Sequence, residues 1–238
     1  VDRWELGDID GAAADFDHAL ELAHRGRRAR FVWIAQSWRA LIATYRGDRD
    51  TADQCRAAAL AAWGPEPNPD AVLCDLAQHL MWALLDERTD EIVPIARFQA
   101  GTDAEPMFWT SLLALATSIN ASGDAAEARD ALHQSQSAID EVLAAGLDNL
   151  LPTVTRLQAL VFLAEAAART GHTDAAEAVG SVLEAEAGCH VVLNVYGGGG
   201  ICWGVVDQAL ALTATTLGDH EAAARWQRSA ERHLAATG

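Results

Sequence analysis

The chain of 238 residues contains no lysine, so all 17 of its basic residues are arginines. It can therefore supply neither the Schiff-base lysine of imine catalysis nor the lysine of a phosphate-binding loop. No apolar run reaches the roughly 18 residues that cross a bilayer, which excludes a membrane-spanning helix. Proline is scarce, at 6 residues, and 50% of the chain is hydrophobic. This balance predicts an ordered, all-α fold.

Recognisable catalytic signatures are missing as well. The sequence contains no G-x-S-x-G or H-E-x-x-H motif and no recognisable arrangement of Cys, His and Asn. Its acidic residues fall in helix-capping positions and on polar helix faces, which is the pattern of a solvated surface rather than of a paired acid and base. We therefore expect a chain that is not an enzyme, with no catalytic residues and no cofactor.

The cysteines form no C-x-x-C pair and no disulfide framework; they are Cys55, Cys74, Cys189 and Cys202. This usage is typical of free thiols in the cytoplasm. Cys189, His190 and Cys202 have the residue types of metal ligands, and so have Asp75 and His79. Zinc sites have four ligands with closer paired spacing, so buried thiols and ordinary histidines are the favoured interpretation, and no metal is expected.

The formal charge of −17 is unevenly distributed. Residues 1–64 hold 10 acidic residues and 9 arginines, and the remainder holds 24 acidic residues and 8 arginines. Such a surface repels phosphate backbones, so we expect no direct nucleic-acid binding from this region. One basic cluster stands out: Arg25, Arg27, Arg28 and Arg30. It has the charge to contact nucleic acid or an acidic neighbour, but we favour a role at a helix C-terminus, where cations complement the helix dipole.

A turn built on Gly-Asp recurs between apolar and Ala-rich helical runs. The copies are Gly7-Asp8, Gly47-Asp48, Gly123-Asp124 and Gly218-Asp219, with a looser version at Gly171-His172-Thr173-Asp174. Glycine ends one helix in a left-handed conformation, and aspartate caps the next by accepting its free N–H groups. The repetition predicts a superhelical array of tetratricopeptide-like helix–turn–helix pairs.

The predicted array covers residues 1–238 as a single helical-repeat domain. An opening half-repeat takes residues 1–27, because only VDRWEL precedes the first turn, where the preceding helix should already exist. This predicts a region cut from a longer protein. The complete pairs are expected at about 28–64, 65–101, 102–146, 147–188 and 189–238. Asn68 or Asp70 is expected to cap a helix after the Pro65–Pro69 break, and Asp90 to cap another.

The chain has 8 tryptophans, a high number for its length. Trp33, Trp38, Trp63, Trp82 and Trp109 fall on or beside the first helices of pairs, and we expect most of them to pack between helices. One or two are candidates to line a concave groove as anchors for a ligand.

The last unit, VYGGGGICWGVVDQALALTATTLGDHEAAARWQRSA, resembles the C-terminal helical arm of actinobacterial signal-transduction ATPases, including LuxR-type regulators and cyclase-like ATPases. The matching residues are Gly204, Val206, Leu210, Leu212, Gly218, Ala222 and Trp226. Val205 stands where that pattern often has proline, and Ala211 where it often has glycine. The resemblance implies a nucleotide-binding switch elsewhere in the parent protein and an arm that senses or docks a partner.

The tetraglycine Gly197–Gly200 is the strongest local anomaly, between an extended or strand-like HVVLNVY and a helix expected from about Cys202. Glycine-rich turns before helices can hold an anion on backbone N–H groups. A flexible connection between repeats is the alternative, and we favour it because the dinucleotide-binding glycine spacing is absent. With the flanking aromatics, the candidate ligand or partner loop consists of Tyr196, Gly197, Gly198, Gly199, Gly200 and Trp203.

The features together predict a non-catalytic, cytoplasmic protein-interaction or regulatory arm of a larger bacterial signalling or transcriptional regulator. Its expected partner is a protein or a neighbouring domain of the parent protein. The alternative is a small-molecule inducer-sensing domain of the same kind of regulator.

Overall fold

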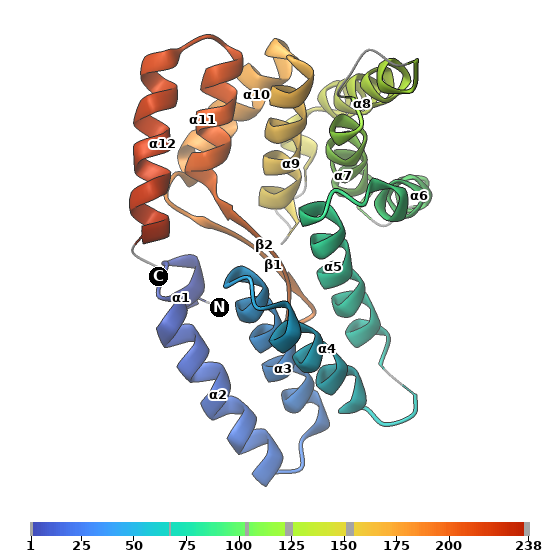
Figure 1. The fold of residues 1–238 in the computed structure, drawn as a ribbon, viewed down its shortest axis with the longest axis vertical. Helices are drawn as coiled ribbons and strands as arrows, with labels where there is room; N and C mark the ends of the chain where they lie inside the picture. The colour runs from blue at the N-terminus through green and yellow to red at the C-terminus, as the bar shows by residue number, and fades with distance from the viewer. Residues whose placement is uncertain (1, 67, 103–104, 122–125, 151–154, 236–238) are drawn as a thin grey trace. The chain divides into compact units, whose positions relative to one another are not determined.

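The computed structural model of the chain describes residues 2–66, 68–102, 105–121, 126–150 and 155–235. Most of these residues lie in helices, and a two-stranded sheet interrupts the helical order (Figure 1). The prediction of a mostly helical fold is confirmed, but the chain is not helical throughout. The extended segment expected after Cys189 is a strand. The predicted Gly123-Asp124 turn lies outside the described residues.

The chain groups into two compact units. The N-terminal unit consists of Val1–Trp82, His190–Trp203 and Ala235–Gly238, and the C-terminal unit of Ala83–Cys189 and Gly204–Leu234. The prediction of one repeat domain over residues 1–238 stays a prediction.

The N-terminal unit combines helices with a β-hairpin that comes from much later in the sequence. Its elements are α1 (Asp2–Glu5), α2 (Ile9–Arg25), α3 (Ala29–Tyr45), α4 (Arg49–Ala61), most of α5 (Pro69–Leu85), β1 (His190–Val195) and most of β2 (Gly198–Val205). Helix α3 packs against α2 and α4. Trp4, Trp33 and Trp38 are fully buried in the core of this unit, whereas Trp63 and Trp82 are only partly buried.

The C-terminal unit is helical apart from its share of β2. Its elements are α6 (Thr89–Ala100), α7 (Pro106–Ile119), α8 (Ala126–Ala145), the 3-10 turn η1 (Leu147–Asn149), α9 (Arg156–Thr170), α10 (Thr173–Leu183), the 3-10 turn η2 (Glu184–Glu186), α11 (Val206–Thr216) and α12 (His220–Ala235). Helix α9 packs against α7, α8, α10 and α11, which explains its long buried run from Gln158 to Ala164.

The recurring Gly-Asp turns adopt the predicted geometry wherever they are described. The glycines have positive φ angles, of 84° at Gly7, 74° at Gly47 and 76° at Gly218. The aspartates accept a hydrogen bond from the N–H three residues later, as in the 3.1 Å contact from Thr51 N to Asp48 Oδ1. Hydrogen bonds to Thr51 hold the pKa of Asp48 below its usual value. The turn chemistry read from the sequence is confirmed.

The turn before α6 departs from the expectation. Arg88, not Asp90, occupies the N-cap position and makes no side-chain cap hydrogen bond, while Asp90 lies inside the first turn. Glu87 takes the left-handed position that glycine fills in the other turns, with a φ of 56°. The prediction of an aspartate cap was wrong because the helix begins at Thr89, two residues earlier than a cap at Asp90 requires. Asn68 caps α5 as expected, through the Asp70 N–H at 2.8 Å.

Gly218→Ala should lower the free energy of unfolding by about 1 kcal/mol, because an added Cβ resists a φ of 76°. No atom lies within 4 Å of that Cβ position, so backbone strain is the whole expected cost. Urea unfolding measures it. Gly101→Ala is the matched control, since Gly101 ends α6 with a φ of −81°. Equal stability of Gly218→Ala and the parent would show that the left-handed turn is not needed.

None of the helices in the described residues is long and apolar enough to cross a membrane.

Candidate partner-binding groove

The candidate ligand or partner loop lies in the β-hairpin: Tyr196 and Gly197 form its turn, Gly198–Gly200 begin β2, and Trp203 lies further along β2. Tyr196 and Gly197 make its two-residue turn, with φ angles of 52° and 99°, the signs that a type I′ turn requires. Tyr196 is exposed and Trp203 is half-buried. Gly198 to Gly200 are buried in β2. The glycine run is therefore a packed strand, and not the flexible connection that we favoured from the sequence.

The buried glycines let the strand approach the helices more closely than any other residue would. A Cβ on Gly198 would lie 2.8 Å from Ser37 Oγ and 2.9 Å from Cys74 Sγ. A Cβ on Gly199 would lie 3.0 Å from the ring of Trp38. Carbon atoms pack at about 3.5–4.0 Å, so neither position has room for a side chain.

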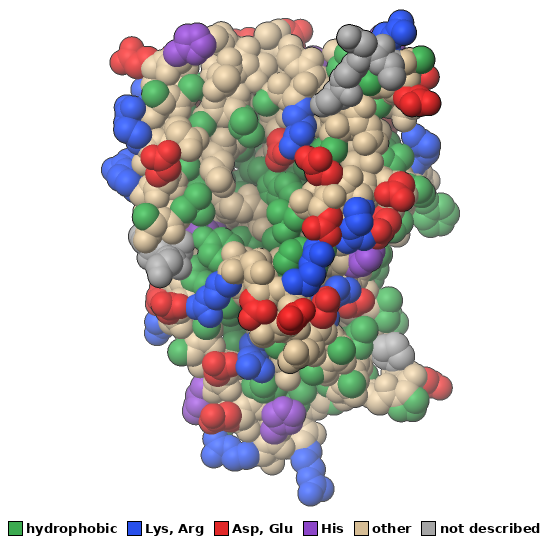
Figure 2. All heavy atoms as spheres, in the orientation of Figure 1, with side chains coloured by type: hydrophobic (Ala, Val, Ile, Leu, Met, Phe, Trp, Pro, Cys, Tyr) green, Lys and Arg blue, Asp and Glu red, His purple; other side chains and the backbone are tan. Residues whose placement is uncertain are grey.

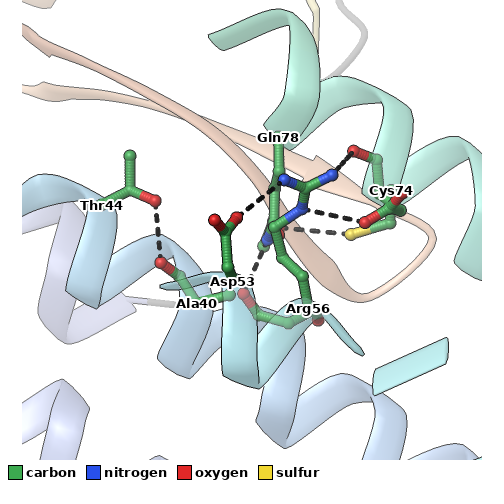
Figure 3. A network of polar contacts seen from close by, with 9 residues as sticks. Ala40, Thr44, Asp53, Arg56, Cys74 and Gln78 are labelled. Atoms are coloured by element: carbon green, nitrogen blue, oxygen red, sulfur yellow. Dashed lines mark hydrogen bonds and ion pairs between the residues drawn. The ribbon is translucent and has the colours of Figure 1, made fainter. Parts of the chain in front are cut away.

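Two polar side chains of α5, Cys74 and Gln78, hold the strand in place (Figure 3). The Gln78 amide donates to the carbonyl oxygens of Ser37, at 2.8 Å, and of Gly199. Cys74 Sγ donates to the same Gly199 oxygen at 3.2 Å. Burial raises the pKa of the Cys74 thiol to about 12, so the group stays protonated as a donor at neutral pH. These contacts satisfy a buried strand carbonyl that would otherwise cost free energy.

The hairpin turn is tied to α3 through Trp38. Its Nε1 donates to the Gly197 carbonyl oxygen at 2.9 Å, although 159 positions separate the two residues. The Gly197 N–H in turn donates to Asn194 Oδ1 at 2.7 Å. Both polar backbone groups of Gly197 are thus used within the N-terminal unit. A role of this turn in ligand binding stays a prediction.

A second feature of the N-terminal unit is an apolar groove between α2 and α3. Its volume is about 280 Å³, and its lining residues are Phe16, Ala19, Leu22, Ala23, Arg28, Phe31, Ile34 and Ala35. Ala23 and Ala35 are buried at its floor, and Phe16 stacks on Trp38 with ring centroids 5.1 Å apart. Leu22 is 50% exposed and Phe31 56%. An apolar surface with exposed aliphatic and aromatic walls is typical of a binding site.

The basic cluster found in the sequence lies at the α2–α3 end of this groove. Arg25 lies in the last turn of α2, Arg28 at the N-cap of α3, and Arg30 in the first turn of α3. Figure 2 shows basic side chains at the lower tip of the view, where Figure 1 places the α2–α3 turn. The dipole interpretation therefore fits Arg25 and Arg27, at the C-terminal end of α2, but not Arg28 and Arg30, because cations at the start of α3 oppose its dipole.

None of these four arginines forms an ion pair within the described part of the chain. Arg3, Arg39 and Arg46, from the same unit, each pair with an aspartate. In a chain with 34 acidic residues and 17 arginines, acidic partners are plentiful. The cluster therefore presents a concentration of positive charge that the protein leaves to the solvent or to a partner.

The α2–α3 turn has the same backbone geometry as the Gly-Asp turns but carries Arg27-Arg28. The N–H groups of Arg27 and Arg28 donate to carbonyls three and five residues earlier, as those of Gly47 and Asp48 do. Arg27 has a φ of 49°, and Arg28 makes no side-chain cap hydrogen bond. Arginine at a positive φ and an N-cap without a side-chain hydrogen bond each lower the stability of the folded protein relative to Gly and Asp at these positions. The Glu87-Arg88 turn before α6 departs from Gly-Asp in the same two ways, so the α2–α3 turn is distinguished by its charge, with arginine at both positions.

Comparisons with protein-family models, with curated proteins and with solved structures find no match to this chain. The resemblance to the helical arms of LuxR-type regulators accordingly stays a prediction. The function has to be argued from the chemistry of the groove and its charges.

Sequence reasoning noticed the arginines but missed the groove. Phe31 and Ile34 belong to an apolar stripe along α3 that predicts burial in the core. Whether they are exposed depends on where α2 crosses α3. One signal was available: Arg27-Arg28 stands where the turns at residues 7–8, 47–48 and 218–219 have Gly-Asp. The candidate metal ligands are not brought together as a site, because no group of three or more His, Cys, Asp or Glu among the described residues could hold a metal ion.

Proposed function

We propose that this chain is a non-catalytic, protein-interaction arm of a larger bacterial signalling or transcriptional regulator, built on tetratricopeptide-like helical pairs. The arm would act in the cytoplasm, in keeping with its free cysteines. The observation that carries the proposal is the apolar α2–α3 groove, whose end carries arginines that form no ion pair with the residues that the structure describes.

The size of the groove favours protein side chains over a whole small molecule. Pockets for drug-sized ligands measure about 300–1,000 Å³ and enclose most of the ligand. The groove has about 280 Å³ and exposed walls, so it suits a few apolar side chains projecting from a partner surface. Exposed aromatic and arginine side chains are also the residue types that carry binding energy at protein interfaces.

The alternative, small-molecule inducer sensing, has one observation in its favour. A groove of about 550 Å³ between α6, α7 and α8 has a mixed polar and apolar lining, which includes Thr89, Asn120 and Gln134. Its volume lies within the range of small-molecule sites. The Thr89 and Asn120 side chains hydrogen-bond to each other, at 2.9 Å, and do not extend separately into the groove. This mutual bond makes the second site the weaker candidate.

Replacing Leu22 and Phe31 with serine should abolish partner binding while leaving the helical content unchanged, because both side chains are already half-exposed. Proteins from cells that carry the parent gene would be captured on the wild-type chain and on the double variant. Each protein lost with the variant would then be purified and titrated by calorimetry. We expect at least about a tenfold loss of affinity, which corresponds to about 1.4 kcal/mol.

Phe98→Ser is the matched control, since Phe98 is 73% exposed on α6 and lies outside the groove. It should bind as the wild type does. If no purified protein distinguishes the groove variant from the control, while a metabolite raises the melting temperature of both, the inducer-sensing alternative replaces the proposal.

A further inference from the structure

We infer that the occupant of the α2–α3 groove is an acidic amphipathic helix of a partner protein, with apolar side chains on one face and carboxylates on the other. This inference rests on the proposed function and names the partner class of the same groove.

The shape of the groove determines the apolar half of the partner. Phe16, Ala19 and Ala23 recur at helical spacing along α2, and Phe31, Ile34 and Ala35 do so along α3. The two helices, with small residues on the floor and large ones on the walls, form a short trough whose apolar lining comes from residues 16–23 of α2 and 31–35 of α3. A third helix fills such a trough with side chains at i, i+3 or i+4, and i+7, as in other helix-in-groove complexes.

The positive charge at the end of the groove determines the polar face of the partner helix. Arg25, Arg27, Arg28 and Arg30 are exposed and lie within six residues of sequence, without ion pairs among the described residues. Arginine binds carboxylates through two parallel hydrogen bonds and, once partly desolvated, more strongly than at an open surface. Arg28 also lines the groove, so it can contact a carboxylate next to the apolar anchors of the same partner.

Charge balance disfavours the main competitors. A second copy of this chain carries −17, and its repulsion by the first copy opposes self-association. A polynucleotide meets the same repulsion, and Phe31 beside the cluster lines an apolar groove in which the other aromatic, Phe16, is already stacked on Trp38. An acidic helix presents only a local negative charge and brings the apolar surface that the groove requires.

The first test selects peptides without assuming a sequence. A displayed library of random 16-residue peptides is panned on the wild-type chain, after depletion on the Leu22→Ser/Phe31→Ser variant. We expect the enriched peptides to be rich in Asp and Glu, with apolar residues at helical spacing. The double variant Arg28→Asp/Arg30→Asp should bind these peptides with about tenfold lower affinity at low salt. Added salt should lower the affinity of the wild type for them. Arg129→Asp, an exposed charge change on α8, is the control and should leave affinity unchanged.

The outcomes separate the inference from the proposed function. If the groove-dependent peptides are neutral or basic, the inference of an acidic partner is wrong, but the proposed function in protein binding is unaffected. Failure to enrich any groove-dependent peptide also overturns the inference, and it overturns the proposed function too if no purified protein depends on Leu22 and Phe31. A single-stranded 12-mer oligonucleotide that binds more tightly than the enriched peptides, and no longer binds Arg28→Asp, would assign the groove to nucleic acid. A wild-type dimer that becomes monomeric in the Leu22→Ser/Phe31→Ser variant would assign it to a second copy of the chain.

A second test uses the turn itself. Arg27→Gly/Arg28→Asp restores the Gly-Asp turn, so the melting temperature should rise by a few degrees while binding of the enriched acidic peptides falls about tenfold. Glu87→Gly is the matched control, because Glu87 occupies the same left-handed position in the turn before α6. It should raise the melting temperature and leave peptide affinity unchanged. Unchanged peptide binding by the restored α2–α3 turn would overturn the role of the two arginines.

Discussion

Trp38→Ala is expected to destabilise the N-terminal unit by about 3–5 kcal/mol, the usual range for removing a large buried aromatic side chain. Trp38 is 0% exposed and lies between two other aromatics, with ring centroids 6.1 Å from Trp4 and 5.1 Å from Phe16. The variant also removes the donor to the Gly197 carbonyl oxygen, so a cavity and an unsatisfied strand group are created together.

Urea unfolding measures the loss, and hydrogen exchange of peptides from α3 and the hairpin locates it in the N-terminal unit. Trp38→Phe keeps an aromatic ring and loses the indole N–H, so it should cost clearly less than alanine. Trp226→Ala, at a half-buried position on α12, is the control in the other unit. A Trp38→Ala protein as stable as the parent would show that the hairpin does not depend on this contact.

Loss of Trp38 should also weaken partner binding. The stack of Phe16 on Trp38 is nearly parallel, with an interplanar angle of 5°, and it supports the α2 side of the groove. The indole thus contacts both the hairpin turn and a residue of the groove lining. The hairpin turn and the groove are therefore joined through one side chain, a connection that no sequence pattern indicates.

The helical architecture was predictable because its signals are local. A Gly-Asp pair such as Gly47-Asp48 combines a left-handed helix end with a cap for the next helix, and both depend only on neighbouring residues. Asp90 failed as a predicted cap for a related reason. Capping depends on the residue at which the helix begins, and Arg88 can occupy that position without contributing a side-chain bond.

The hairpin was not predictable because its partners are distant in sequence. A run of four glycines is consistent either with a flexible connection or with a strand that packs closely against its neighbours. Only the atoms that face the glycines decide between the two. Those atoms belong to Trp38, Cys74 and Gln78, more than a hundred residues earlier. The groove escaped prediction similarly, since the exposure of Leu22 and Phe31 follows from helix crossing and not from periodicity.

Gly198→Val should destabilise the N-terminal unit by about 3 kcal/mol, the upper part of the usual range for overpacking a core. The first added carbon alone would lie 2.8 Å from Ser37 Oγ, 2.9 Å from Cys74 Sγ and 3.2 Å from the Trp33 ring. These atoms belong to two helices of the core, so none can move away without disturbing its neighbours. We expect β2 to detach from α3 and α5 before the helices themselves unfold.

Cys74 reports this detachment directly. In the wild type its thiol is buried and its pKa is raised to about 12, so iodoacetamide at pH 8 should leave it unmodified. Gly198→Val should increase Cys74 alkylation by at least about tenfold, measured by mass spectrometry, because exposure returns the thiol toward its ordinary pKa.

Cys55, buried on α4 away from the glycine contacts, is the internal reference and should change less. Gly101→Val, where an added Cβ meets only ordinary contacts, is the control variant. Parallel exposure of Cys55 and Cys74 would mean that the whole unit opens at once, and protection of both would mean that the strand tolerates a side chain at Gly198.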